Sequence, residues 1–397
     1  MAIFDILLWY GAIALTHLFI QLNLAHIYYL KMRKEKFDGN FTPSVLIVIP
    51  SYNEDYESLK RSIDSTLRQE YGGKIKVMLV DDGSSDRETI KKIKGYFKKE
   101  IELKDLVVEE FEKNKGKRHA QKHAFDKVND VEIIVTIDSD TILRHNTIAN
   151  LVQKFKDPII GAVTGDVRVI NKENILTRLI DCRYWTAFNQ ERAAQSLFGT
   201  VLCCSGPLAA YRKSVINKVK DKYISQRFLG EFCTYGDDRH LTNLVLERGY
   251  QVKFEPKAKA KTDVPSNIKK WLRQQARWNR SFYRELLWTI RIIIRKPFAL
   301  HPYIIYDVIV QTILPLLLFF SLIYMIYRSF TFGIIYLYGY LTVLGSIAFA
   351  RSFYALIRTK DKSFFLFPIY AILHVFLLIP VRIFSLLTMK TTRWGTR

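Results

Sequence analysis

Long apolar runs mark both ends of the chain. Residues 6–30 contain no Asp, Glu, Lys or Arg. A helix of this length, at about 1.5 Å per residue, can cross the roughly 30 Å hydrocarbon layer of a membrane. Four basic residues between positions 31 and 36 follow directly, so the positive-inside rule places the N-terminus outside and the next domain in the cytoplasm. We expect the polar members of this helix to face other helices rather than lipid. They are His17, Gln21, Asn23 and His26.

The C-terminal part of the chain holds three further apolar runs. Residues 304–327 and 330–350 are predicted to be two spanning helices joined by a short external turn. The third run, residues 364–389, contains two prolines and Arg382, and it is basic at both ends. If it crossed the membrane, one basic flank would lie outside, against the charge rule. We therefore expect a re-entrant or interfacial segment with a cytoplasmic C-terminus, and an ordinary spanning helix is the alternative.

A basic amphipathic stretch, residues 266–297, lies between these hydrophobic regions. Glu285 is its only acid, and Trp271, Trp278 and Phe282 supply apolar contacts at near-helical spacing. Such a helix is expected to lie flat on an anionic membrane surface. The patterns together predict an N-terminal transmembrane helix, a cytoplasmic domain, interfacial helices, and a C-terminal transmembrane and interfacial region with a cytoplasmic tail. Their residue ranges are 1–36, 37–265, 266–300 and 301–397.

The central region alternates between short apolar runs and helix-like segments. The runs 45–49, 75–80, 107–111 and 133–137 are predicted strands, and each of the first three is followed by a helical pattern. Strands that alternate with helices predict a parallel α/β sheet of the Rossmann-like type with right-handed crossovers. Ligands of such sheets bind at the carboxyl ends of the strands. Polar or acidic clusters follow three of the four predicted strands, which indicates a binding site at that edge.

Composition narrows the possible classes of protein. The chain has 397 residues and a formal net charge of +22, and 49% of its residues are hydrophobic. These values exclude a disordered chain, and the four cysteines, which we expect to be reduced thiols, are too few for a disulfide scaffold. The chain has no DNA-reading or RNA-reading motif. The positive charge therefore favours membrane lipids or an anionic substrate over nucleic acid.

The acidic clusters at the predicted strand ends suit a nucleotide and a metal ion. Asp138 and Asp140 lie on the same side of an extended chain, and their hard oxygen atoms suit Mg²⁺ or Mn²⁺ bound to a phosphate; a helix N-cap pair is the alternative. Asp81 and Asp82 could accept hydrogen bonds from a nucleobase or ribose, or could only build a turn. Lys117 opens a predicted helix, where it could bind phosphate or remain a solvated charge.

Three later segments add candidate binding residues. The turn Cys204-Ser205-Gly206 consists of small residues, which permits close approach of a ligand. Asp237 and Asp238 are two adjacent acids before a predicted helix, where N-cap residues are the alternative to a functional role. One face of the basic helix can present an amide, a guanidinium and an indole to a sugar diphosphate. These side chains belong to Gln274, Arg277 and Trp278.

Short motifs follow one another along the chain at these positions. They are Pro50-Ser-Tyr-Asn-Glu54, Val80-Asp-Asp-Gly-Ser84, Lys117-Arg-His-Ala-Gln121, Asp138-Ser-Asp-Thr141, Glu191-Arg-Ala-Ala-Gln-Ser196, Cys204-Ser-Gly-Pro207, Gly236-Asp-Asp-Arg-His240, Gln274-Gln-Ala-Arg-Trp278, Trp278-Asn-Arg-Ser-Phe282 and Trp394-Gly-Thr-Arg397. Taken together, they resemble the motifs of the processive membrane-bound family 2 glycosyltransferases, and most closely those of the bacterial (class I) hyaluronan synthases. The resemblance covers about residues 40 to 397 in collinear order. Bacterial relatives usually carry two N-terminal spanning helices, whereas we expect one in this chain.

The resemblance implies a fold and a set of roles. The fold is a GT-A-like domain joined to a helical transmembrane region with amphipathic interfacial helices. Asp81 or Asp82 would hold the uridine, with Tyr52 and Glu54 nearby. Asp138 and Asp140 would bind Mn²⁺ or Mg²⁺ at the UDP diphosphate, and Asp238 would be the general base, with Asp237 the less favoured choice. Gln274, Arg277 and Trp278 would position the diphosphate and the acceptor sugar. Cys204 would lie near the acceptor terminus, and Trp394 and Arg397 would fold back towards the site.

The implied activity is hyaluronan synthesis from UDP-GlcA and UDP-GlcNAc, with extrusion of the polysaccharide through the plasma membrane. No obligatory protein partner is inferred. Three alternatives remain open: a chitin or chito-oligosaccharide synthase that uses UDP-GlcNAc only, a non-processive lipid-phosphate glycosyltransferase, and an inactive scaffold that keeps the fold.

Overall fold

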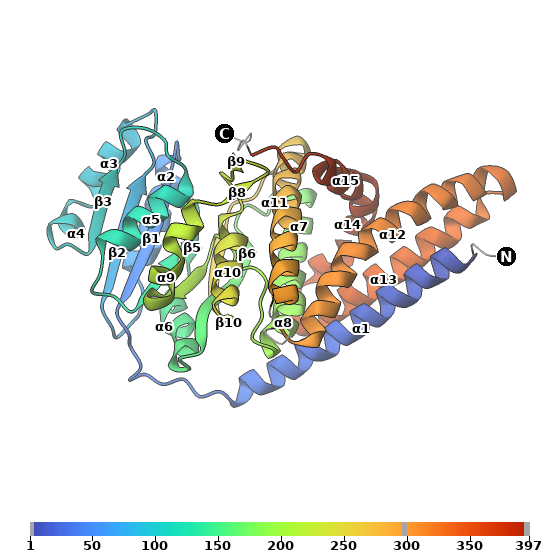
Figure 1. The fold of residues 1–397 in the computed structure, drawn as a ribbon, viewed down its shortest axis with the longest axis horizontal. Coiled ribbons are helices and arrows are strands. Elements are labelled where there is room, and N and C mark those ends of the chain that lie inside the picture. Colours follow the sequence, from blue (N-terminus) through green and yellow to red (C-terminus); the bar gives the residue numbers. More distant parts are fainter. Residues whose placement is uncertain (1–3, 296–299, 393–397) are drawn as a thin grey trace.

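A computed structural model describes residues 4–295 and 300–392 of the chain. Figure 1 shows an α/β region on one side and a helical region on the other, with α1 running beneath both. The strands are β1 (Val45–Ser51), β2 (Ile75–Asp81), β3 (Leu106–Glu110), β4 (Ile133–Thr136), β5 (Ile142–Leu143), β6 (Ile160–Val169), β7 (Ala209–Arg212), β8 (Arg227–Phe228), β9 (Glu231–Phe232) and β10 (Gln251–Thr262).

Helices make up most of the remaining described chain. They are α1 (Phe4–Lys34), α2 (Tyr56–Leu67), α3 (Glu88–Tyr96), α4 (Lys98–Glu102), α5 (Lys117–Lys127), α6 (Thr147–Val152), η1 (Gln153–Lys156), α7 (Ile175–Thr186), η2 (Ala187–Arg192), α8 (Ala193–Leu197), α9 (Lys213–Ile224), α10 (Asp237–Glu247), α11 (Ile268–Arg295), α12 (Pro302–Phe332), α13 (Ile335–Thr359), η3 (Lys362–Leu366), α14 (Phe367–Leu373), η4 (His374–Leu378) and α15 (Ile379–Leu387).

The main sheet has eight strands in the order β3-β2-β1-β4-β7-β6-β10-β5. The four strands predicted from the apolar runs are all present and parallel to one another. The prediction of a parallel sheet is nevertheless incomplete, because β7 runs antiparallel to both β4 and β6. Ala209 at the start of β7 pairs with Thr136 at the end of β4. The turn before β7 therefore reaches the same sheet edge as the residues after β4.

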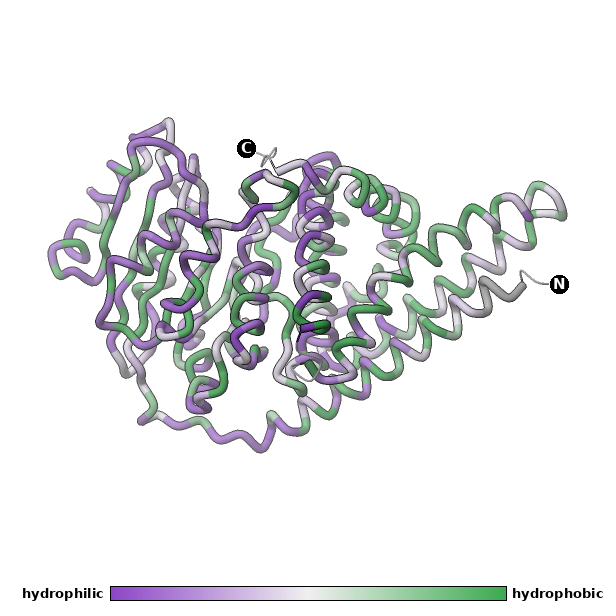
Figure 2. Tube along the Cα trace, viewed as in Figure 1, coloured by the Kyte–Doolittle hydropathy of each residue, from purple (hydrophilic) through white to green (hydrophobic). Residues whose placement is uncertain are grey.

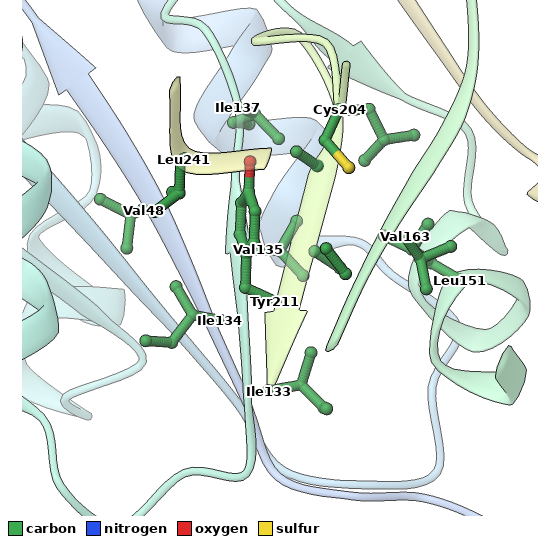
Figure 3. Packing of buried hydrophobic residues seen from close by; sticks show 14 of the residues in the cluster. Val48, Ile133, Ile134, Val135, Ile137, Leu151, Val163, Cys204, Tyr211 and Leu241 are labelled. Carbon is green, nitrogen blue, oxygen red and sulfur yellow. The ribbon is translucent and has the colours of Figure 1, made fainter. Parts of the chain in front are cut away.

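The centre of the sheet is apolar on both faces. Every residue of β1 and β4 is buried, as the unbroken apolar runs predict for strands covered by helices on both sides. Figure 3 shows the packing between these strands and their neighbours, with Val135 between Val48 on one side and Val163 on the other. This core fixes the positions of the strand ends at which the polar clusters lie.

The helical region contains a bundle of α1, α12 and α13, which run side by side away from the sheet in Figure 1. The outer part of this bundle is strongly hydrophobic in Figure 2. Four helices in the described residues are long and apolar enough to cross a membrane: 9–34, 302–332, 335–359 and 362–387. The last of these is interrupted by η3 and η4, and its final part, α15, packs along α11. Whether it spans or lies at the interface stays a prediction, as do the domain boundaries.

Two of the four polar residues of α1 make the predicted contacts with other helices. His17 and Gln21 are buried. His17 Nε2 lies 3.7 Å from Asp307 of α12, and Gln21 accepts a hydrogen bond from Arg351 of α13. The prediction is wrong for Asn23 and His26, whose side chains are exposed. Asn23 instead donates to the carbonyl of Phe19, one turn earlier in its own helix.

Helix α10 begins in close contact with α11. Gly236 precedes it with a φ of +82°, a conformation that favours glycine. A Cβ atom at Gly236 would lie 2.0 Å from the hydroxyl oxygen of Ser281 in α11. A side chain there cannot be accommodated without moving one of the two helices. Gly236 therefore fixes how Asp237 and Asp238 sit relative to α11.

We predict that Gly236→Ala lowers the free energy of unfolding by about 1–3 kcal/mol, the usual range for backbone strain of this kind. Gly95→Ala is the matched control, because Gly95 lies inside α3 and a Cβ atom added there would have open space around it; it should be neutral or stabilising. Thermal unfolding of the full chain in detergent compares the two. Equal midpoints for both variants would contradict this account of the α10–α11 contact.

Candidate active site

The ends of β1, β2 and β4 bring the predicted polar clusters to one edge of the sheet. Ser51 pairs with Asp81, and the N–H of Asp82 donates to the carbonyl of Ser51. Ser139, just beyond β4, donates a 2.5 Å hydrogen bond to the carboxylate of Glu54. Tyr52 lies half-buried between Ser51 and Asn53 in the same loop. The three strand ends therefore meet, as expected for a parallel sheet.

Asp81 and Asp82 both hold the surrounding loops in shape. The buried carboxylate of Asp81 accepts hydrogen bonds from the backbone N–H and hydroxyl of Ser84, and it pairs with Arg87 at 3.2 Å. Asp82 accepts from the N–H groups of Lys115 and Gly116, each at 2.8 Å. Burial raises the pKa of Asp82, and these two bonds oppose the rise. The turn-building role is thus present in the structure, and a contact with uridine would be additional to it.

A cavity of about 320 Å³ opens beside these loops. Its lining includes Asn53 and Glu54 from the loop after β1, and Ser84 and Asp86 from the loop after β2. All of its lining side chains except Ile90 are polar, and they offer both hydrogen-bond donors and acceptors. The cavity could accommodate a flat polar group next to the strand ends.

Lys117 joins the two most acidic parts of the site. Its Nζ atom lies 2.6 Å from Asp138 after β4 and 3.0 Å from Asp237 at the start of α10. A Cβ atom at Gly206 would lie 3.1 Å from the carboxylate of Asp138 and 3.3 Å from Lys117 Nζ. The small-residue turn before β7 therefore lies directly against this ion pair, as the position of β7 in the sheet requires.

The pKa values of the neighbouring residues Asp237 and Asp238 are shifted in opposite directions. Burial would raise the pKa of Asp237, but Lys117 and Arg118 outweigh it and hold the pKa below its usual value. Asp238 has its pKa raised by burial and by the negative charge of Asp237. Two adjacent acids whose pKa values are pushed apart are suited to different roles. Asp237 is the constant anion, and Asp238 has the greater tendency to take up a proton.

Asp138 and Asp140 form the part of the site that could hold a metal ion. Asp140 accepts a 2.9 Å hydrogen bond from Thr262. Burial, reinforced by the charge of Asp138, raises the pKa of Asp140 to about 7. A divalent cation would relieve this accumulation of negative charge, so the donor set fits one. Within residues 4–295 and 300–392 no cluster of three or more metal-ligating side chains exists, so a cation here would need ligands from elsewhere, such as a diphosphate.

The two adjacent cysteines point in different directions, and the position of Cys204 near the acceptor terminus stays a prediction. Cys204 is fully buried, and Figure 3 shows its sulfur in the hydrophobic core. The sulfur of Cys203 instead lies 3.5 Å from Asp238 Oδ2. Burial raises the pKa of Cys203 to about 12, so it stays a neutral donor to this carboxylate. Successive side chains of an extended chain point to opposite sides, which is the signal that could have identified Cys203.

Trp278 brings the basic helix α11 close to the site. Trp278 is 43% exposed, and its ring centroid lies 6.5 Å from that of Tyr184 in α7. Tyr184 in turn interacts electrostatically with Asp140, which links the face of α11 to the carboxylates. One turn earlier, the amide oxygen of Gln274 is buried without a hydrogen-bond partner in the described part of the chain. Arg277 lies half-buried between them.

The described end of the chain returns to the loop before α10. Tyr235 donates to the carbonyl of Thr391, and Thr234 donates to the carbonyl of Thr392. These contacts place the C-terminal segment next to Gly236 and the acidic pair. The predicted roles of Trp394 and Arg397 concern residues that lie outside the described ranges.

Comparison with known proteins identifies the family. A model of Glycosyl transferase family 2 matches residues 46–220. The chain is 39% identical to a hyaluronan synthase of Streptococcus pyogenes over 98% of its own length and 90% of that protein. It is 36% identical to an N-acetylglucosaminyltransferase of Neorhizobium galegae over 92% of its length and 82% of that protein.

The fold is also found in a solved structure. A mannosyltransferase of Pyrobaculum calidifontis, determined with GDP-Man and Mn²⁺, aligns over 98% of this chain and all of its own, with a TM-score of 0.57 and 19% identity. The similarity supports the GT-A-like assignment of the α/β region. With its four apolar helices and its close similarity to hyaluronan synthases, the chain is a membrane protein that belongs to glycosyltransferase family 2.

Proposed function

We propose that this protein is a hyaluronan synthase, which alternately transfers glucuronate and N-acetylglucosamine from UDP-sugars to a growing polysaccharide. The observation that carries the proposal is the junction at Lys117, where the end of β4, the start of α10 and the turn 203–206 meet. The ion pairs of Lys117 with Asp138 and Asp237, and the approach of Gly206 to Asp138, support a common site for donor and acceptor. The near full-length similarity to hyaluronan synthases supports the choice of product.

The donor would bind along the strand ends. The uridine would occupy the region of Tyr52, Glu54, Asp81 and Asp82, next to the polar cavity. Asp138 and Asp140 would hold Mn²⁺ or Mg²⁺, which would supply neutralisation of the charge that develops on the leaving diphosphate.

Basic and polar side chains would surround the diphosphate. Lys117 would donate to its oxygen atoms from the start of α5, where the backbone N–H groups also favour an anion. Gln274 and Arg277 would orient the diphosphate from α11. Trp278 would stack on the acceptor sugar, because aromatic rings pack against sugar faces.

Asp238 would act as the general base. Its raised pKa moves it towards the range in which a carboxylate accepts a proton efficiently. The acceptor hydroxyl would lose its proton to Asp238 and attack the anomeric carbon from the face opposite UDP. This single displacement inverts the configuration of the donor. Ser205 and Gly206, together with Cys203, would form the wall against which the acceptor terminus rests.

The membrane helices would position this chemistry for export. The protein would be a multi-pass component of the plasma membrane, and the basic residues beside its apolar helices support a cytoplasmic position for the α/β domain. A polysaccharide with one carboxylate per disaccharide is too polar to cross lipid alone, so the helical region would provide its path. The similarity to rhizobial N-acetylglucosaminyltransferases favours one second candidate, a synthase of chitin-like chains from UDP-GlcNAc only.

Metal binding should depend on pH. Because Asp140 has a pKa of about 7, a cation must displace a proton below that pH, and the apparent affinity for Mn²⁺ should fall by up to about tenfold per pH unit. Calorimetric titration with Mn²⁺ and UDP between pH 5.5 and 8.5 measures this. Asp263→Asn should shift the fall in Mn²⁺ affinity to lower pH, because Asp263 adds to the negative charge around Asp140. Equal affinity at pH 6 and pH 8 would contradict metal binding that displaces a proton from Asp140.

The product test uses the two donors separately and together. Purified protein should make a long product only when UDP-GlcA and UDP-GlcNAc are both present, and a hyaluronan-specific lyase should digest it. Asp238→Asn should lower incorporation at least 100-fold, since a general base contributes about 10²–10⁴ in rate. A long polymer from UDP-GlcNAc alone would exclude hyaluronan synthesis in favour of the chitin-like alternative.

A further inference from the structure

The motif Glu191–Ser196 has no role in the chemistry proposed above, yet its side chains make contacts in several directions. It begins in η2, a π-helical turn that connects α7 with α8. Such turns are rare and occur mostly as insertions at functional sites. The contacts of the segment show what it holds in place.

Two residues of this segment hold the turn before β7. The guanidinium of Arg192 donates from Nε to the carbonyl of Cys203 at 3.0 Å and from Nη2 to the hydroxyl of Ser205 at 2.9 Å. The amide oxygen of Gln195 accepts from the N–H of Leu202 at 3.2 Å. Arg192 is itself held over the ring of Phe188, 4.1 Å from its centroid. The planar guanidinium suits this pair of contacts, and an ammonium cannot reproduce both in one geometry.

The other side of the same turn faces the candidate catalytic groups. Cys203 contacts Asp238 through its thiol, and Gly206 lies against Asp138 and Lys117. The backbone between these two contacts is the part that Arg192 fixes. A small movement of the turn would therefore change the distance between the base and anything resting on the turn.

The segment is also anchored in the helical region. The amide nitrogen of Gln195 donates to the buried carboxylate of Asp307 in α12 at 2.8 Å, and Gln311 donates to the same oxygen. Glu191 forms two hydrogen bonds with Arg183 of α7, at 2.7 and 3.2 Å. Gln195 thus contacts the turn before β7 through its amide oxygen and α12 through its amide nitrogen.

We propose that Arg192 and Gln195 are positioning residues for the acceptor sugar: they hold the turn Leu202–Gly206 so that an acceptor hydroxyl lies within reach of Asp238, and they tie this turn to α12. The inference rests on the proposed glycosyl transfer, and it assigns these residues no contact with the donor nucleotide. Loss of either residue should allow the acceptor to shift while UDP-sugar still binds and can react with water.

The test compares Arg192→Gln and Arg192→Lys with a matched control, Arg212→Gln. Arg212 also donates to backbone carbonyls, those of Phe155, Asp157 and Ile160, and also lies over a ring. It does so at the opposite end of β7, which pairs with the start of β4. For each variant, the ratio of UDP released to sugar incorporated is measured, together with the KM for each donor, the product length and the thermal midpoint.

Arg192→Gln should lower incorporation by about tenfold or more, since small misplacements of reacting groups have effects of this size. Its ratio of UDP released to sugar incorporated should rise severalfold, while donor KM stays within about twofold. Arg192→Lys should be intermediate, and it provides the comparison if the glutamine variant does not fold. Arg212→Gln should change only the thermal midpoint.

Two results would overturn the proposal. One is an unchanged ratio and product length in both Arg192 variants. The other is a parallel loss of UDP release, incorporation and donor affinity, which is the behaviour of a residue that only supports the fold. Failure of the proposed function would be distinguishable from failure of this inference. The unmodified protein would then make no lyase-sensitive product when both donors are supplied. The ratio can still be measured on whichever polymer that protein makes.

Discussion

The site depends on one largely buried cation, the ammonium group of Lys117, placed between the carboxylates of Asp138 and Asp237. These three residues come from the first turn of α5, the loop after β4 and the start of α10, which are far apart in the sequence. Two carboxylates so close together would repel each other strongly in a partly dry environment. Lys117 offsets this repulsion, and its charge keeps Asp237 ionised while leaving Asp238 with a raised pKa. The different properties of the two adjacent acids thus follow from which of them Lys117 contacts.

The polar clusters at the carboxyl edge of the sheet could be predicted from the sequence by combining two simple rules. Unbroken apolar runs mark buried parallel strands, and polar residues just after them must lie at the carboxyl edge. These rules correctly bring together the loops after β1, β2 and β4. They give no information on β7, a short strand whose direction is set by its partners on both sides. The antiparallel direction of β7 is nevertheless what delivers the turn 203–206 to Asp138.

Side-chain direction limited the prediction of individual site residues. The sequence places two cysteines next to the small-residue turn, and the family motif selects Cys204, but the structure turns Cys204 into the core and Cys203 towards Asp238. The contacts of Arg192 and Gln195 could not be predicted from the sequence either. They depend on a π-helical turn, and no local sequence pattern predicts that turn. Long apolar runs located the candidate membrane helices, because length and composition alone define them. They could not tell that Asn23 and His26 would be exposed on α1.

The most direct test of the central claim is a structure of the full protein with UDP and Mn²⁺ by electron cryomicroscopy. The account predicts the uridine beside Asp81 and Asp82, the metal signal against Asp138 and Asp140, and the diphosphate within reach of Lys117, with Asp238 facing the same cleft. A nucleotide and metal bound away from the junction at Lys117, or an Asp238 side chain that opens into a separate space, would contradict it.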